Sequence, residues 1–154
     1  MSVSTATVIS DTILYIRDQL KSNITDPLSR TNGVGFITTG FPKRKADFPM
    51  ITVRKQNLDF GERLGMQTEA FYATVLLELR IFARNEKERD SLTQDVMTYL
   101  NSNQFPYTTS NTSTQVDLHD FRVVNCTNID EMTSEGGVLT CSIGVSYRFL
   151  YGLS

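Results

Sequence analysis

His119 is the only histidine in the chain, so any acid–base chemistry would centre on it. Asp117 lies two positions earlier and Asp120 follows directly; on a strand, residues 117 and 119 would share one face. A Ser-His-Asp relay of the hydrolase type also needs a G-x-S-x-G turn, which the sequence lacks. We therefore expect a surface histidine, no catalytic residues and no enzymatic activity.

The two cysteines, Cys126 and Cys141, are the other candidates for chemistry. Together with one histidine they are too few for a structural zinc site, which takes about four ligands. No basic neighbour in the sequence would lower the pKa of either thiol. We expect both cysteines to be reduced and buried, and we expect no metal or cofactor site.

Composition excludes several classes of function. The 15 Lys and Arg residues are outnumbered by 17 Asp and Glu, which argues against a dedicated nucleic-acid-binding protein. The sequence shows no secretory leader and no run of apolar residues that could cross a bilayer, so we expect a cytosolic origin and no membrane partner. Thr, Ser and Asn make up 41 of 154 residues, which predicts a surface rich in uncharged hydrogen-bonding groups.

Hydrophobic periodicity predicts two helices in one domain that spans 1–154. Ile9, Ile13, Ile16 and Leu20 recur at helical spacing and predict a helix over about 6–22. A second helix over 86–102 is predicted to start after Asn85 as its N-cap. We expect a loop over 25–49 and a polar loop over 103–115.

Strict alternation of apolar and polar residues predicts the strands. The segment 71–83 alternates over 13 residues, beyond the usual 3 to 10. We therefore expect it to project past the domain or to pair with something outside it. A strand predicted over 50–57, followed by a glycine-containing loop over 58–68 as the hairpin tip, would form with it a long hairpin over 50–83. Two further strands are predicted over 116–127 and 138–151. The predicted fold is α+β: a two-layer sandwich of a mainly antiparallel sheet with two helices on one face and a long projecting β-hairpin.

Two surface features leave alternatives open. Lys43, Arg44 and Lys45 form the only basic cluster, read either as a solvated turn or as a contact with an acidic partner or phosphate. Three aromatic residues recur at every second position around Arg148 and could stack on the bases of single-stranded nucleic acid; they are Tyr147, Phe149 and Tyr151. The core interpretation is favoured, because these aromatics continue the apolar face that begins at Leu139.

The order of the predicted elements is distinctive. An amphipathic helix leads into Phe-Pro-Met-Ile-Thr-Val-Arg at 48–54, and a strand ending Glu-Leu-Arg-Ile-Phe-Ala-Arg at 78–84 runs directly into the helix Asn-Glu-Lys-Glu-Arg-Asp-Ser-Leu at 85–92. Two strands then close the chain. This order resembles the tail terminator and tail-completion proteins of long-tailed bacteriophages, and more loosely the neck proteins that join head to tail. The resemblance covers about 5–152.

This resemblance implies a virion structural protein of the tail or neck, assembled in the host cytoplasm as a hexameric ring. Such a ring would cap the major tail tube protein and present a surface to the head-completion (neck) protein, and DNA could pass through it. Apolar residues of the long hairpin would then be the subunit contacts, unless they fold back on their own domain; they are Leu58, Phe60, Leu64 and Met66. The alternatives are a head-closure or adaptor protein of the neck and, from another class, a small nucleic-acid-binding module.

Overall fold

The computed structural model describes residues 7–40, 47–63, 71–102, 104–109, 116–129 and 138–151. Two helices, one 3₁₀ turn and five strands follow one another along the chain. They are α1 (Val8–Asn23), the 3₁₀ turn (Thr31–Gly33), β1 (Ile37–Thr38), β2 (Met50–Arg63), β3 (Phe71–Ala83), α2 (Glu86–Leu100), β4 (His119–Asn128) and β5 (Leu139–Tyr151).

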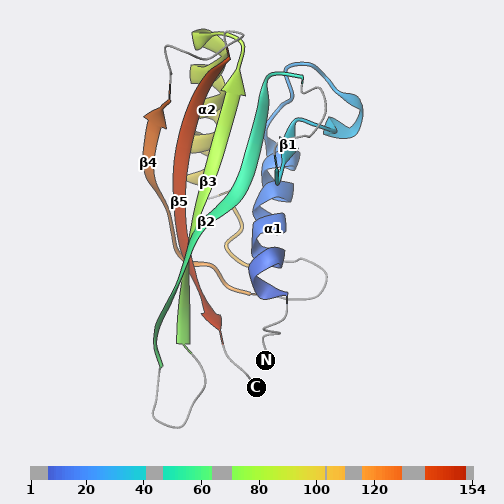
Figure 1. Cartoon of the computed structure of the whole chain (residues 1–154). Coiled ribbons are helices and arrows are strands. Elements are labelled where there is room, and N and C mark those ends of the chain that lie inside the picture. Colours follow the sequence, from blue (N-terminus) through green and yellow to red (C-terminus); the bar gives the residue numbers. More distant parts are fainter. Residues whose placement is uncertain are drawn as a thin grey trace.

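The five strands form one sheet in the order β1-β2-β3-β5-β4. All neighbouring pairs are antiparallel except β1 with β2, which is parallel over two residues. Figure 1 shows α2 behind β3 and β5, and α1 alongside β2. One core cluster contains residues from both helices and from one face of the sheet, which confirms the predicted two-layer α+β sandwich.

β3 lies at the centre of the sheet, and its register determines which side chains are buried. Its whole length pairs with β5, from Phe71 opposite Tyr151 to Ala83 opposite Leu139, and β2 pairs along its other edge. A strand of this length was expected to project or to pair outside the domain. Both of its edges are instead occupied by strands of the same chain, so β3 needs no outside partner. The loop predicted over 58–68 as the hairpin tip is wrong in its first part, because β2 continues as a strand to Arg63 and pairs with β3 as far as Phe71. Residues 64–70 lie outside the described residues, and the projecting hairpin stays a prediction.

The core is built from alternate residues of the central strands. Odd-numbered residues of β3 and β5 face the helices, and away from the strand ends they are fully buried; the buried ones include Ala73, Val75, Leu77, Leu79, Ile81, Ile143, Val145, Tyr147 and Phe149. The hydroxyls of Tyr147 and Thr12 of α1 lie 2.9 Å apart and form a hydrogen bond that ties this helix to the sheet. Tyr15 donates a hydrogen bond to the carbonyl of Pro106, 2.6 Å away, and so attaches the segment after α2 to the same layer.

Local sequence signals explain where the second helix begins. Asn85 has extended backbone angles, and its side chain accepts a hydrogen bond from the N–H of Glu88 at 2.9 Å, as predicted for an N-cap. Glu88 reaches back to Arg84, accepting from its backbone N–H at 3.1 Å and forming an ion pair with its guanidinium. That ion pair and hydrogen bond lower the pKa of Glu88.

Two predicted boundaries need correction. The strand predicted over 116–127 begins only at His119, because Asp117 forms an isolated bridge with Thr108 and the Thr109 N–H donates to the carbonyl of Val116. The segment predicted as loop over 25–49 contains the short strand β1, whose Ile37 aligns with Ile51.

The register predicts that replacing two leucines of β3 lowers the free energy of unfolding by unequal amounts. Leu79 is fully buried against the helices, whereas Leu76 lies half-buried on the opposite face of the sheet. Leu79→Ala should lower the free energy of unfolding by about 2–5 kcal/mol, and Leu76→Ala by about 1 kcal/mol or less. Urea unfolding followed by circular dichroism measures both. Equal losses would show that the two faces are assigned wrongly.

Candidate functional site

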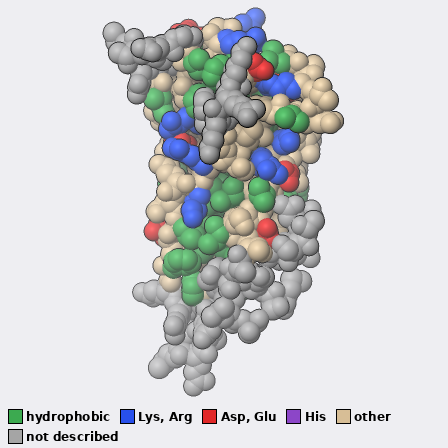
Figure 2. Space-filling model, turned by 45° about the vertical axis from the view of Figure 1, so that its right-hand side comes forward, with side chains coloured by type: hydrophobic (Ala, Val, Ile, Leu, Met, Phe, Trp, Pro, Cys, Tyr) green, Lys and Arg blue, Asp and Glu red, His purple; other side chains and the backbone are tan. Residues whose placement is uncertain are grey.

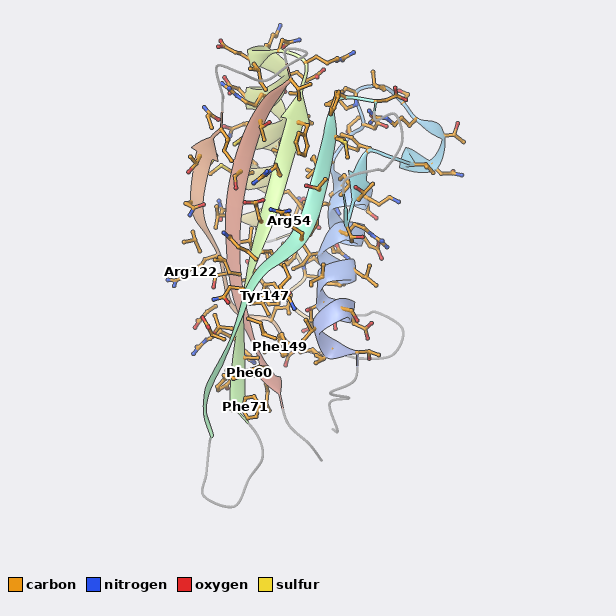
Figure 3. All side chains as sticks on the ribbon, in the orientation of Figure 1. Arg54, Phe60, Phe71, Arg122, Tyr147 and Phe149 are labelled. Carbon is orange, nitrogen blue, oxygen red and sulfur yellow. The ribbon has the colours of Figure 1, made fainter. Side chains whose placement is uncertain are left out.

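The most exposed aromatic side chain of the described residues lies near the far end of β2. Phe60 is 54% exposed, although it aligns with Ala73 on the face of the sheet that elsewhere packs on the helices. Its ring meets the ring of Phe71 edge-on, with centroids 5.3 Å apart. Figure 3 shows both rings at the lower end of the β2–β3 pair, and Figure 1 shows this end below the first turn of α1. The apolar face of the sheet therefore continues beyond the helix that covers it.

The other predicted contact residues divide into two groups. Leu58 is partly buried and packs on the core, which favours for this residue the alternative that it folds onto its own domain. Leu64 and Met66 lie outside the described residues, as do Lys43, Arg44 and Lys45. Of the four predicted contact residues, Phe60 is therefore the exposed one within the described residues. Phe71, which was not predicted, lies beside it.

The outer edge of β2 adds backbone hydrogen-bonding groups to this site. β1 pairs only with Ile51 and Thr52, and beyond them the edge of β2 has no strand partner within the described ranges. A groove of about 290 Å³ lies between this edge and α1, with Ile13 and Leu14 on one wall and Lys55 on the other. Figure 2 shows hydrophobic side chains in the lower half of this side of the molecule, with Lys and Arg side chains spread among them. Such an edge can accept a segment of another chain.

The opposite edge of the sheet, β4, is shaped differently. Most of its side chains are exposed, and its register with β5 shifts twice, once around Asp120 and once around Val124. Asp120 has a φ of 52°, and the side chain of Asn125 accepts the N–H of Gly144 at 3.1 Å. Bulges of this kind twist an edge away from a flat pairing surface. Of the two edges, β2 is the better template for a partner.

The face of the sheet opposite the helices carries paired charges. Glu78 is 8% exposed, and its Oε1 lies 3.0 Å from Arg80 and 3.4 Å from Arg54. Ser142 on β5 donates to the other carboxylate oxygen at 3.2 Å. One carboxylate thus lies between two guanidinium groups, an arrangement that depends on the alignment of Arg54 with Glu78 across the strands. The one carboxylate neutralises one of the two guanidinium groups, so the cluster keeps a net charge of +1.

His119 belongs to a second cluster on this open face. Its ring meets Tyr72 edge-on at 5.8 Å, and the Arg148 guanidinium lies 5.2 Å from the centre of the Tyr72 ring. Asp120 forms an ion pair with Arg148, while Asp117 accepts a hydrogen bond from the Thr108 hydroxyl. The two aspartates that flank His119 in sequence are therefore engaged with other side chains.

The aromatic strip of β5 is part of the core. Tyr147 and Phe149 are both fully buried, and burial raises the pKa of the Tyr147 hydroxyl despite its hydrogen bond with Thr12. Neither ring can stack on a nucleic acid base without unfolding the sheet; the side chain of Tyr151 lies outside the described residues. The core interpretation of Tyr147 and Phe149 is confirmed.

The cysteines differ from the prediction in one respect. Cys141 is buried as expected, but Cys126 is exposed, because it lies on the edge strand β4. Among the described residues, no three His, Cys, Asp or Glu side chains come together to hold a metal ion. No described helix is long and apolar enough to cross a membrane.

A hollow lies between the ends of the two helices. It measures about 660 Å³ and is lined by short polar side chains together with Ile24, Asp95 and Tyr99. Tyr99 donates to Gln19 and accepts from Asn23 within it, so its hydroxyl is already satisfied. This hollow brings together no set of groups suited to a reaction.

No protein-family model and no curated protein matches the sequence. The candidate site is therefore argued from its geometry alone. That geometry consists of the exposed Phe60 against the half-buried Phe71, and an open β2 edge at one end of the sheet. The contribution of Phe71 was missed, because only the register between β2 and β3 brings it beside Phe60.

The exposure of Phe60 predicts that it contributes little to the folding of the single subunit. Phe60→Ser should lower the free energy of unfolding by less than about 1 kcal/mol, close to other surface substitutions. Leu58→Ser removes a side chain packed on the core and should cost about 2 kcal/mol or more. Urea unfolding of the dilute protein distinguishes the two. A larger loss for Phe60→Ser would place Phe60 in the core of its own domain.

Proposed function

We propose that this chain is a virion structural protein that forms a ring at the head-proximal end of a phage tail, where it ends the tail tube and joins it to the neck. The observation that carries the ring assembly is the exposed Phe60, in contact with the half-buried Phe71, beside the open edge of β2. The phage tail is inferred from the resemblance in element order, and the six-membered stoichiometry comes from the same source.

The proposed contact is head-to-tail, so that the patch around Phe60 meets a different surface of the next subunit. A contact of this kind closes into a ring when its rotation closes. Aromatic side chains at the centre of an interface supply most of the binding free energy, and a polar rim excludes water around them. Phe60 and Phe71 suit the centre of such an interface.

A second subunit is a better occupant of this patch than a small ligand. Phe60 is 54% exposed, whereas sites for small molecules are concave and bury most of their ligand. The proposed role is binding: the tube protein meets one side of the ring and the head-completion protein the other. A neck adaptor one ring nearer the capsid is the second candidate, since it would use the same kind of contact.

A nucleic-acid-binding module is less well supported. Two of the aromatic residues it would need, Tyr147 and Phe149, are buried in the core. Binding through the remaining cations would be dominated by phosphate contacts and would weaken steeply with salt. A titration with single-stranded DNA at two salt concentrations tests this directly, and micromolar affinity with a steep salt slope would favour the module over the ring.

The ring proposal predicts the effect of one substitution on assembly. Phe60→Ser should raise the concentration needed for assembly on the tail tube protein of the same phage by about 30-fold. This change corresponds to a loss of about 2 kcal/mol of binding free energy between subunits. Native mass spectrometry and electron microscopy of the mixed proteins measure the assembly. Recovery with portal or adaptor proteins but never with tube protein would identify the neck adaptor instead.

Leu150→Ser is the matched control. Leu150 is 38% exposed and aligns with Tyr72. The substitution therefore removes an apolar side chain from the same end of the sheet but from the opposite face. This variant should assemble like the unaltered protein. If both variants assemble normally, the Phe60 patch is not the contact. If the unaltered protein stays monomeric and is missing from purified tails, the ring itself is wrong.

A further inference from the structure

The two cysteines form a pair that the sequence does not predict. Cys126 on β4 and Cys141 on β5 bring their Sγ atoms to 3.3 Å, close enough for one thiol to hydrogen-bond the other. Cys126 aligns with Ile143, and Cys141 aligns with Asn128, so the two cysteines are diagonal neighbours on the helix-facing side of the sheet. One is exposed and the other fully buried.

We propose that Cys126 and Cys141 are a site of reversible oxidation, at which a low-molecular-weight disulfide closes an intramolecular disulfide bond that fastens the edge strand β4 to β5. The exposed Cys126 is the group that an oxidant can reach, and Cys141 lies behind it as the resolving thiol. This inference is independent of the proposed ring.

The chemistry balances as two thiol–disulfide exchanges. The Cys126 thiolate attacks glutathione disulfide, forming a mixed disulfide and releasing one glutathione thiolate. The Cys141 thiolate then attacks Sγ of Cys126, forming the protein disulfide and releasing the second glutathione thiolate. The two protons lost by the cysteines are taken up by the two released thiolates. The protein is oxidised by two electrons, and glutathione disulfide is reduced.

The geometry also predicts that the bond is easily reduced. Diagonal neighbours in an antiparallel pair have Cα atoms about 7–8 Å apart, while disulfides usually span 4.4–6.8 Å. Closing the bond therefore requires β4 to shift slightly toward β5. β4 is an edge strand, paired on one side only within the described residues, so this shift disturbs little else. Bonds under such strain are reduced more readily than ordinary structural disulfides.

Neighbouring groups set how fast the first step runs. Burial, followed by the contact with Cys141, raises the pKa of the Cys126 thiol to about 11. The charged groups of α2 beside it are Arg89, which opposes this shift, and Asp90, which adds to it. The thiolate fraction is therefore small at neutral pH. The rate of oxidation should increase about tenfold per pH unit from pH 7 to 10, whereas a free cysteine levels off near its ordinary pKa of about 8.5.

The test is to treat the reduced protein with glutathione disulfide and to analyse it by mass spectrometry. Both cysteines lie in the tryptic peptide 123–148, because no Lys or Arg separates them. The intramolecular bond should appear as the loss of two hydrogen atoms from this one peptide, reversible with dithiothreitol. Because the bond closes a loop of 15 residues, the oxidised protein should also unfold about 5–10 °C higher.

Cys126→Ser is the matched control, and it should show neither the mass change nor the thermal shift. Cys141→Ala should stop at a stable glutathione adduct on Cys126, which separates the attacking thiol from the resolving one. A stable adduct on the unaltered protein, a disulfide-linked dimer, or two thiols that stay free at pH 9 would each overturn the proposal.

Discussion

The register between β3 and its two neighbours is the constraint on which the rest of the molecule depends. Because β3 pairs along its full length with β5 and along most of it with β2, alternate side chains of three strands face the helices together. That alignment builds the core around Leu79 and places Phe60 on the apolar side of the sheet. It also brings Arg54 to Glu78 on the open side. A shift of one residue would reverse all three placements.

Local patterns predicted much of this fold. The alternation in 71–83 identifies β3, and the Asn85 cap the start of α2, to the residue; the strand predicted over 138–151 begins one residue later, at Leu139. The predicted start at 116 failed because Asp117 bonds to Thr108, a contact that depends on the loop between them closing. Residues that meet only through the register could not be predicted either. Bulges near Gln56 and Val124 change which partners face each other, and no local signal gives the pairing of Phe60 with Phe71 or of Cys126 with Cys141.

The two ends of the sheet differ in a way that suits a subunit of an assembly. Toward the top in Figure 1, the helices cover the inner face, and β1 occupies the edge of β2. Toward the bottom, Phe60 remains exposed, and the β2 edge has no strand partner within the described part of the chain. The opposite edge is protected by its bulges, so one edge is open to a neighbour and the other is not. This asymmetry favours directed, head-to-tail contacts over indiscriminate aggregation.

Amide hydrogen exchange tests the central claim most directly, because it reads the β2 edge itself. Exchange over 53–60 should be compared between the isolated protein and the protein in assembled tails, with β4 as the internal reference. If the Phe60 patch and the adjoining edge form the subunit contact, amides of 53–60 become strongly protected on assembly, while those of β4 change less. Unchanged exchange over 53–60, with protection elsewhere, would contradict the proposed interface.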